Sequence, residues 1–264
     1  MSGISEAPVA LVTGATRGTG REIALALANE GHDVAVLGRT VDQLDSLAAE
    51  IAAMGRRVLT LPADIMDADA IDIAMARLLD WSGDRISVLV NVAGIPGPLS
   101  PPIGQIALAE FDAVIATNLR GPFLTMSRLL PVMYRQRSGR VVNIGGNHGM
   151  RGRAGRASYS ASKWALRGLT RSAALEAGPY GVTVNYVAPG PIAVARMRAG
   201  WAARAQAEGV EEQVVIDRYV ADMGIAMGRP NEPADVVAMV LFLIGEGARN
   251  ITGQELVVDG GVIV

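Results

Sequence analysis

The chain has 264 residues, of which half are hydrophobic, and a formal net charge of −2 at pH 7. The hydrophobic share can form a sizeable core, and the scattered charges of both signs leave no basic footprint for nucleic acid. Because the sequence has no cysteine, a disulfide framework, a thiolate metal site and a cysteine nucleophile are excluded. Neither histidine lies in a cluster with metal-ligand spacing, so we expect no metal.

The sequence shows no feature that would direct the chain to a membrane. The first 14 residues lack the basic segment and the long apolar run of a signal peptide. The longest apolar run, residues 236–244, is far shorter than the ~20 residues that span a bilayer. We therefore expect a cytoplasmic protein.

Short apolar runs alternate with longer segments of helical periodicity along the chain. The runs are dense in Val, Leu and Ile, which is typical of strands buried on both faces. The segments between them have apolar residues three and four positions apart and end at a glycine, which indicates helices. This alternation predicts a single domain, residues 1–264, with a Rossmann-type, doubly wound parallel sheet and helices on both faces. The seven expected strands are residues 9–14, 33–38, 57–62, 86–94, 140–146, 182–190 and 255–260.

The first expected strand leads directly into a glycine-rich turn, "TGATRGTG" at residues 13–20, and then into a helix. Gly14 permits a tight turn, and Gly18 and Gly20 allow the backbone and the helix to approach a pyrophosphate closely. The helix N-terminus adds free N–H groups and the positive end of its dipole. Glycine-rich turns are common, but this strand–turn–helix context predicts a dinucleotide site. Two more residues of the turn are expected at the cofactor, Thr16 and Arg17.

The end of the second expected strand indicates which dinucleotide is bound. NAD sites usually place a carboxylate there for the ribose 2′-OH, whereas this chain has Gly38-Arg39-Thr40. Arg39 and Arg17 together suit a 2′-phosphate, because each guanidinium is a planar, multidentate donor. We therefore expect NADP(H) as the cofactor and keep NAD(H) as the alternative, since either arginine alone would be an ordinary surface charge.

Tyr159 and Lys163 lie four positions apart and therefore on one face of an expected helix. A free phenol has a pKa of about 10, too high for general-base work at neutral pH. A nearby ammonium and a positive nicotinamide ring favour the phenolate and lower that pKa. The pair is therefore able to move protons. Beside the expected dinucleotide it would serve hydride transfer between a carbonyl and a secondary alcohol, with Tyr159 as general acid or base and Lys163 also holding the ribose. Such pairs also occur on ordinary surface helices.

Residues 192–228 depart from the strand–helix rhythm and form a long insertion with helical patches. Insertions at the carboxyl edge of such sheets usually lie over the binding crevice, so we expect a substrate-binding lid. A surface helical excursion is the alternative. Arginines of this segment could meet an anionic substrate, but a solvated helix of mixed charge is the commoner explanation. The charged residues concerned are Arg196, Arg198, Arg204, Glu208, Glu211, Glu212 and Asp217.

With these motifs in place, the chain resembles the short-chain dehydrogenase/reductase family over nearly its whole length. Each shared motif is loose alone, but the order and spacing of the set are specific. The landmarks are the glycine-rich turn, Asp64, "NVAG" at 91–94, Asn118, Tyr159-x-x-x-Lys163, "PGPI" at 189–192 and "ITGQELVVDGG" at 251–261.

The resemblance implies roles for these landmarks. Asp64 would contact the adenine, and Asn118 would hold a water that relays protons to Lys163. Family members are commonly dimers or tetramers, so we expect a homodimer or homotetramer. The further cofactor-binding residues that the resemblance implies are Asp64, Ile65, Asn91, Ala93, Gly94, Pro189, Gly190 and Ile192.

Two positions depart from the family pattern. The family serine that donates a hydrogen bond to the substrate oxygen, thirteen residues before the tyrosine, is Gly146 here. Losing one such donor typically costs on the order of 10²–10³ in rate. If the chain stays extended, His148 points to the same side as residue 146 and could replace the serine, and Asn147 could do so if the glycines allow a turn. Val194 replaces a threonine that contacts the cofactor, a loss of about 0.5–1.5 kcal/mol.

Three functions are compatible with these observations. The first is an NAD(P)(H)-dependent oxidoreductase acting on a small carbonyl or alcohol, which the retained Asn118, Tyr159 and Lys163 favour. The second is an impaired protein of this fold that binds NADP(H) as a sensor or regulator, which Gly146 and Val194 favour. The third is an interaction module. Keto-thioesters, sugars, cyclic ketones and polyols are all compatible as substrates.

Overall fold

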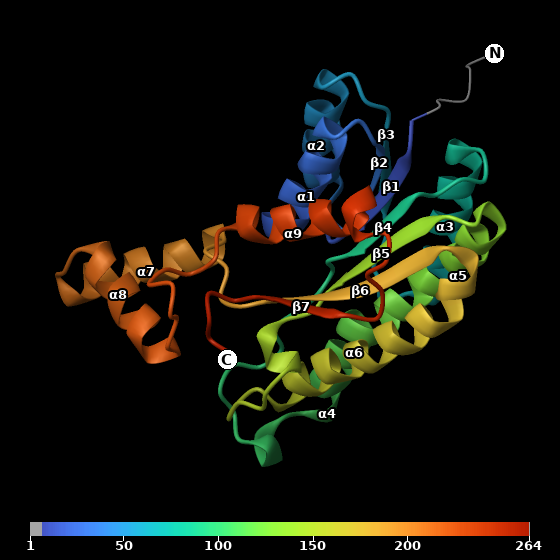
Figure 1. Ribbon diagram of the computed structural model, residues 1–264. Coiled ribbons are helices and arrows are strands. Elements are labelled where there is room, and N and C mark those ends of the chain that lie inside the picture. Colours follow the sequence, from blue (N-terminus) through green and yellow to red (C-terminus); the bar gives the residue numbers. More distant parts are fainter. Residues whose placement is uncertain (1–6, 264) are drawn as a thin grey trace.

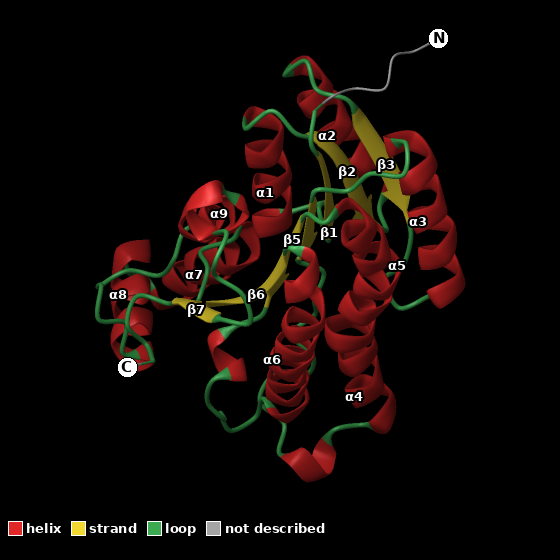
Figure 2. Cartoon of the chain, turned by 45° about the vertical axis from the view of Figure 1, so that its right-hand side comes forward, coloured by secondary structure: helices red, strands yellow, loops and turns green. Residues whose placement is uncertain are grey.

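Seven parallel strands form one sheet in the order β3-β2-β1-β4-β5-β6-β7. The computed structural model describes residues 7–263, and Figures 1 and 2 show the sheet between two layers of helices. This is the Rossmann-type α/β architecture that the sequence predicts. The strands are β1 (Val9–Thr13), β2 (Asp33–Gly38), β3 (Val58–Pro62), β4 (Val88–Asn91), β5 (Gly139–Ile144), β6 (Val182–Pro189) and β7 (Glu255–Val258).

The two faces of the sheet are covered by different helices. Helices α1, α2 and α9 pack on one face, and α3, α5 and α6 pack on the other, with α4 against α6. Helices α7 and α8 belong to the insertion between β6 and α9. The helices are α1 (Gly18–Asn29), α2 (Val41–Ala53), α3 (Ala68–Ser82), α4 (Leu108–Ile115), α5 (Gly121–Gln136), α6 (Ala157–Ala177), α7 (Ala195–Glu208), α8 (Glu212–Met223) and α9 (Pro233–Ile244).

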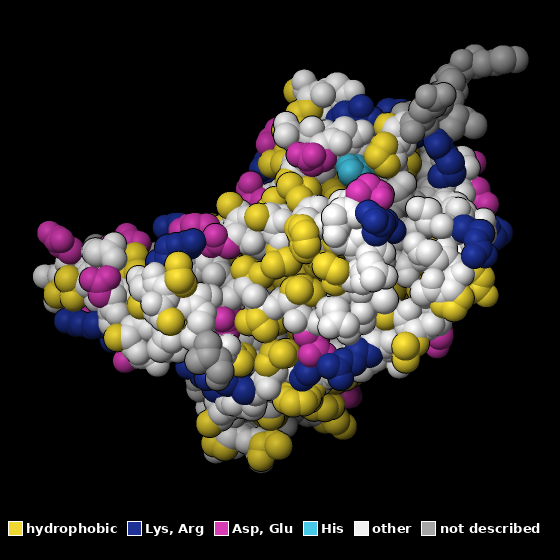
Figure 3. Space-filling view, viewed as in Figure 1, with side chains coloured by type: hydrophobic (Ala, Val, Ile, Leu, Met, Phe, Trp, Pro, Cys, Tyr) yellow, Lys and Arg dark blue, Asp and Glu magenta, His cyan; other side chains and the backbone are white. Residues whose placement is uncertain are grey.

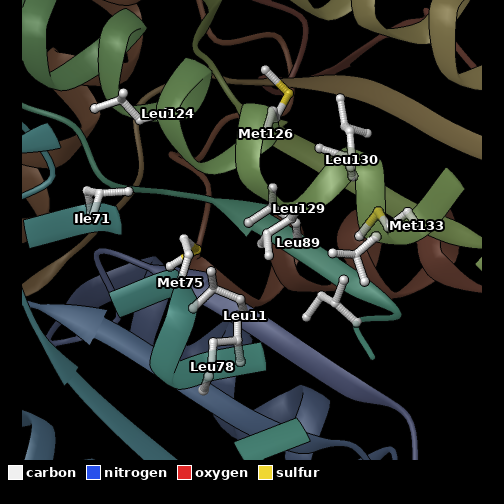
Figure 4. Packing of buried hydrophobic residues seen from close by; sticks show 14 of the residues in the cluster. Leu11, Ile71, Met75, Leu78, Leu89, Leu124, Met126, Leu129, Leu130 and Met133 are labelled. Carbon is white, nitrogen blue, oxygen red and sulfur yellow. The ribbon is translucent and has the colours of Figure 1, made fainter. Parts of the chain in front are cut away.

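The sheet has one hydrophobic core on each face, and alternate residues of each strand point into one core or the other. Leu11 of β1 and Leu89 of β4 point toward α3 and α5, where they pack with Met75 and Leu129 (Figure 4). Their neighbours on the opposite face, such as Val12, pack against α1, α2 and α9. Since both faces are covered, the strands are mostly apolar, which explains why they lack polar alternation.

The strand order reverses between β1 and β4, and this position defines the binding crevice. From β1 the chain continues to β2 on one side, whereas β4 and β5 lie on the other side. Ligands of such sheets bind beyond the carboxyl ends of the strands at this switch point.

The predicted strand bounds 86–94 and 140–146 are too long, because β4 ends at Asn91 and β5 at Ile144. The released segments 92–96 and 145–149 turn into the crevice region instead.

The insertion forms a pair of helices, α7 and α8, that projects from the body beside the carboxyl end of β6 (Figure 1). It has a small core of its own, composed of Ala193, Trp201, Ala205 and Val215. Trp201 is therefore a packing residue. Two of the arginines named above are paired with carboxylates, since Arg198 binds Glu232 at 2.6 Å and Arg204 binds Glu208 at 2.6 Å.

A chain of buried polar side chains ties the sheet to α5 and α6. Thr125 Oγ1 donates to Asn91 Oδ1 at 2.8 Å, and Asn91 Nδ2 donates to Asn143 Oδ1 at 2.9 Å. Asn143 Nδ2 in turn donates to Thr170 Oγ1 at 2.9 Å. Each member is satisfied, which is the condition under which a buried polar network stabilises a fold.

Two negative findings apply to residues 7–263. No helix in this range is long and apolar enough to cross a membrane. Over the same range, no three His, Cys, Asp or Glu side chains gather as metal ligands would.

Replacing Asn143 with alanine is expected to lower the free energy of unfolding by about 2–3 kcal/mol, because it leaves the Asn91 amide buried without an acceptor. Urea denaturation followed by circular dichroism measures this. The exposed helical change Gln206→Ala is the control and should shift the free energy by no more than about 0.5 kcal/mol. Equal stability of Asn143→Ala and the control would show that the network contributes nothing.

Candidate active site

A cavity of about 510 Å³ lies at the switch point between β1 and β4. It is formed by the glycine-rich turn, the ends of β2 and β3, the segment after β4 and the start of α7. Most of the residues predicted to bind the cofactor line this cavity. They are Gly14, Thr16, Arg17, Gly18, Gly20, Arg39, Asp64, Ile65, Ala93 and Gly94.

The shape of the turn fits a pyrophosphate. A Cβ atom at Gly20 would lie 2.3 Å from the Gly14 carbonyl oxygen, so only glycine allows α1 to start this close to β1. The N-cap residue of α1, Arg17, makes no side-chain capping hydrogen bond, and the first turn has no acidic residue. The backbone N–H groups at this helix end are therefore free for an anion.

The two arginines predicted at the 2′-phosphate both line the cavity. Arg39 follows β2 directly and is mostly exposed, with its Nη1 atom 3.8 Å from Asp64 Oδ2. This separation is long for an ion pair, so Arg39 retains free donors. The described cavity lining has no carboxylate on β2 itself, where a ribose 2′-OH would need one.

Six residues predicted at the cofactor do not line this cavity. Two of them, Tyr159 and Lys163, lie next to it and are described below. Asn91 lies behind it, in the buried polar network. Pro189 and Gly190 pack beside β7, where a Cβ atom at Gly190 would lie 2.7 Å from Asp259 Cβ. Ile192 forms a bridge with Asn231. Val194, by contrast, does line the cavity.

Tyr159, Lys163 and Asn118 converge next to the cavity at Gly94. Lys163 Nζ donates to the Ile144 carbonyl at 3.1 Å and lies 5.6 Å from the centroid of the Tyr159 ring. A Cβ atom at Gly94 would lie 3.6 Å from Lys163 Nζ and 3.3 Å from Asn118 Oδ1. The predicted proton-transfer residues and the predicted cofactor residues therefore form one continuous site.

Asn118 holds this arrangement together. Its Oδ1 atom accepts from the Ile95 N–H at 2.8 Å, and its Nδ2 atom donates to the Ile95 carbonyl at 3.0 Å and to Ser162 Oγ at 3.1 Å. It lies in a π-helical segment, Ala116–Arg120, between α4 and α5. Such single-turn bulges are frequent at functional sites, because they aim a side chain out of the regular helical register.

Lys163 is the sole lysine in a sequence with 24 basic residues. It is only 3% exposed, and burial lowers the pKa of its ammonium to about 8. Arginine could not replace it in a proton relay, because the guanidinium stays protonated at any physiological pH. The choice of lysine at this one position therefore points to a group that must give up its proton.

Burial raises the pKa of the Tyr159 phenol, and the Arg156 guanidinium opposes this effect. Arg156 Cζ lies 5.0 Å from the centroid of the Tyr159 ring. The sequence analysis predicted that Lys163 and a nicotinamide ring lower this pKa. In the structure burial outweighs the opposing charge, and that charge is Arg156, which the sequence analysis missed. The three arginines in "RGRAGR" (151–156), just before the tyrosine, were the available signal.

Gly146 lies directly against Tyr159. A Cβ atom at position 146 would be 3.2 Å from the Tyr159 hydroxyl, so a side chain there would reach the place where the substrate oxygen is expected. The backbone of Gly146 is held by the buried Tyr186 of β6. Its N–H donates to Tyr186 Oη at 3.1 Å, and the Tyr186 hydroxyl donates to its carbonyl at 3.1 Å.

Tyr186 also explains the neighbouring glycines, and the sequence analysis missed it. A Cβ atom at Gly145 would lie 1.8 Å from Tyr186 Cζ, and one at Gly149 would lie 2.3 Å from its hydroxyl oxygen. Burial raises the pKa of this phenol, so it stays protonated and keeps its donor role. A tyrosine in the otherwise Val-rich and Asn-containing run "VTVNYV" was the signal.

His148 lies beside Tyr159, but for a different reason from the one predicted. The chain does not stay extended, because residues Asn147–Gly149 form a 3₁₀ turn. This turn brings the His148 ring to an edge contact with Tyr159, with 5.6 Å between centroids. Burial and the nearby Arg156, Arg153 and Arg151 lower the pKa of His148 to about 4, so its imidazole is neutral at pH 7.

Asn147 is the other predicted substitute for the serine. It is 4% exposed, and its Nδ2 atom has no hydrogen-bond partner among residues 7–263. Buried donors without a partner are rare, and each one calls for an explanation. The turn therefore carries two side-chain groups next to Gly146 that could donate a hydrogen bond.

Comparison with known proteins shows which family the chain belongs to. A family model described as short chain dehydrogenase matches residues 8–206. A 3-oxoacyl-[acyl-carrier-protein] reductase of Staphylococcus aureus is 37% identical over 254 residues, which cover 96% of this chain and 97% of that protein. The corresponding reductase of Synechocystis sp. is 37% identical over 260 residues, 98% of each chain. The chain therefore belongs to the short-chain dehydrogenase family and is an oxidoreductase.

Solved structures share the whole fold. Actinorhodin polyketide ketoreductase, in a variant with NADPH, superposes with a TM-score of 0.88 at 34% identity over 97% of both chains. Levodione reductase gives a TM-score of 0.86 at 31% identity over 96% of both chains. The similarity thus extends over the insertion and the last strand as well as the sheet.

Because Lys163 is the sole lysine, its titration can be measured directly. In protein labelled with ¹³Cε-lysine, the single resonance is expected to titrate with a midpoint near pH 8, since burial lowers this pKa. An exposed lysine would titrate near pH 10.4. A midpoint above pH 10 would show that the amine is solvated and would remove the basis for its part in proton transfer.

Proposed function

We propose that the protein is an NADP(H)-dependent oxidoreductase that interconverts a carbonyl and a secondary alcohol. The observation that carries this proposal is the position of the sole lysine. Lys163 is buried beneath Tyr159 and next to Gly94 of the dinucleotide cavity. The similarity to 3-oxoacyl-[acyl-carrier-protein] reductases and to polyketide ketoreductase supports the same class of reaction.

The cavity residues would hold the cofactor in a defined order. The glycine-rich turn and the N-terminus of α1 bind the pyrophosphate, and Arg17 and Arg39 bind the 2′-phosphate. Asp64 and Ile65 line the part of the cavity assigned to the adenine. A bound NADP(H) supplies the hydride that is exchanged with the carbonyl carbon.

Tyr159 and Lys163 move the accompanying proton. In reduction, the Tyr159 phenol donates its proton to the carbonyl oxygen as negative charge develops there. Lys163, with a pKa of about 8, can restore that proton and hold the phenolate electrostatically. Asn118 fixes the Ile95 segment and Ser162, so the lysine approaches the tyrosine from a rigid frame.

The site works with glycine at position 146, and a neighbouring side chain offsets part of the loss. His148 is neutral and touches Tyr159, so its imidazole N–H can donate to the substrate oxygen. Asn147 offers its unpartnered amide from the same turn. The alternative of a sensor without turnover gains no support from the relatives, which are named as reductases.

Two further features complete the proposal. The start of the insertion, Val194–Arg196, lines the cavity, so α7 and α8 would act as a lid over the substrate.

Figure 3 shows hydrophobic side chains gathered over α9 and β7, and Phe242 of α9 is 48% exposed. An exposed apolar patch of this kind suits the expected homodimer or homotetramer.

Replacing Tyr159 with phenylalanine is expected to lower kcat on any accepted carbonyl by about 10³-fold, because it removes the general acid. NADPH binding, measured by fluorescence titration, should be unchanged. A Tyr159→Phe enzyme that keeps wild-type turnover would exclude the assigned role. Tight NADPH binding by wild type with no turnover on a broad carbonyl panel would favour the sensor.

Replacing Arg39 with aspartate is expected to lower the ratio of NADPH to NADH affinity by about 10²-fold. A charge-assisted hydrogen bond of about 1.5–3 kcal/mol is lost, and a carboxylate repels the 2′-phosphate. Arg77→Gln on α3, away from the cavity, is the control and should leave the ratio unchanged. If the ratio stays the same in Arg39→Asp, the assignment of the 2′-phosphate site is wrong.

A further inference from the structure

Arg151, Arg153 and Arg156 lie near His148, and Arg196 lies near Arg156. None of the four has a carboxylate within ion-pairing distance in the described part of the chain. Arg151, Arg153 and Arg156 belong to the segment before α6, and Arg196 lies in the first turn of α7. The other arginines of the insertion are paired: Arg218, for example, binds Glu208 at 2.7 Å.

Arg156 is the central member of this group. Its guanidinium lies over the Tyr159 ring, 5.0 Å from the centroid, and it is partly buried. Burial is the main cause that lowers the pKa of Arg156. Tyr159 opposes this effect, and the like charges of Arg153 and Arg196 lower the pKa further. A partly desolvated cation with like charges around it is unfavourable unless an anion offsets the charge.

The contacts that these arginines make within the chain do not neutralise them. Arg153 Nη1 lies 3.0 Å from Met223 Sδ of α8, and Arg151 Nη1 donates to the Val262 carbonyl at 3.3 Å. Both partners are uncharged, and they belong to the lid and to the C-terminal segment. The positive side chains near the site therefore come from two segments, the loop before α6 and helix α7 of the insertion.

The N-terminus of helix α6 adds to the positive electrostatic potential at the site. Tyr159 lies in the first turn of the 21-residue helix α6, which has no acidic residue in that turn and no side-chain cap. The positive end of the helix dipole therefore points toward the same region. A neutral ketone, sugar or polyol would leave Arg151, Arg153 and Arg156 without a counter-ion.

We propose that the substrate is an oxo acid, or the hydroxy acid formed from it, whose carboxylate binds the Arg156 guanidinium while its carbonyl faces Tyr159. This proposal rests on the carbonyl reduction proposed above. A guanidinium that lies over an aromatic ring keeps its in-plane N–H donors free for a bidentate carboxylate. Because Arg156 is so close to the Tyr159 ring, the carboxylate must lie only a few bonds from the carbonyl carbon, and it takes no part in bond making.

The binding test uses hexanoate and its neutral isostere hexanamide, titrated calorimetrically into enzyme saturated with NADPH. Saturation keeps the probe away from the arginines of the dinucleotide cavity. Wild type is expected to bind hexanoate at least tenfold more tightly than hexanamide. Arg156→Gln should lose this preference, and Arg77→Gln, a distant exposed arginine on α3, should keep it.

Equal affinities of hexanoate and hexanamide in wild type would overturn the proposal without recourse to any variant. A preference for hexanoate that survives Arg156→Gln would overturn the role of Arg156.

Turnover separates this proposal from the proposed function. With 4-oxopentanoate and 4-oxopentanamide as substrates, Arg156→Gln is expected to lower kcat/KM for the acid by 10-fold or more and for the amide by less than 3-fold. Equal losses for both would mean that Arg156 acts only through Tyr159, which contradicts a carboxylate site. Selective hexanoate binding without turnover of either ketone would support the anion site and contradict the reductase function.

Discussion

The Tyr186 hydroxyl makes two hydrogen bonds to the backbone of Gly146, and the geometry of the active-site loop depends on this contact. The buried ring fills the space that side chains at Gly145 and Gly149 would need. The chain therefore leaves β5 at Ile144 and turns at once, which brings His148 to Tyr159 and the Ile144 carbonyl to Lys163. The backbone at the serine position is thus held in place by Tyr186.

The site contains two kinds of basic side chain: arginines, which stay charged, and Lys163 and His148, which can lose or lack a proton near neutral pH. The chain has arginine at every strongly basic position except 163, where it has its single lysine, the residue proposed to exchange a proton with Tyr159. Arg17 and Arg39 line the cavity at the switch point, while Arg156 lies over the Tyr159 ring. The lowered pKa of His148 follows from the same cations, so the site combines fixed charges with a neutral imidazole.

The parallel sheet, the glycine-rich turn and the Tyr159–Lys163 pair could be predicted from the sequence, because they depend on local periodicity and spacing. The ends of β4 and β5 could not, since they depend on how segments 92–96 and 145–149 pack in the crevice. The place of His148 was predicted for the wrong reason, because strand parity does not hold in a 3₁₀ turn. Tyr186 and Arg156 act through contacts with residues that only the folded chain identifies as partners.

The most direct test of the central claim is to follow the hydride itself. Wild-type enzyme is incubated with an accepted carbonyl compound and NADPH that carries deuterium at C4, each C4 epimer in turn, and the alcohol is analysed by mass spectrometry and NMR. The account predicts deuterium at the carbinol carbon from one epimer and none from the other. NADPH that binds tightly but transfers no deuterium to any carbonyl compound would contradict it.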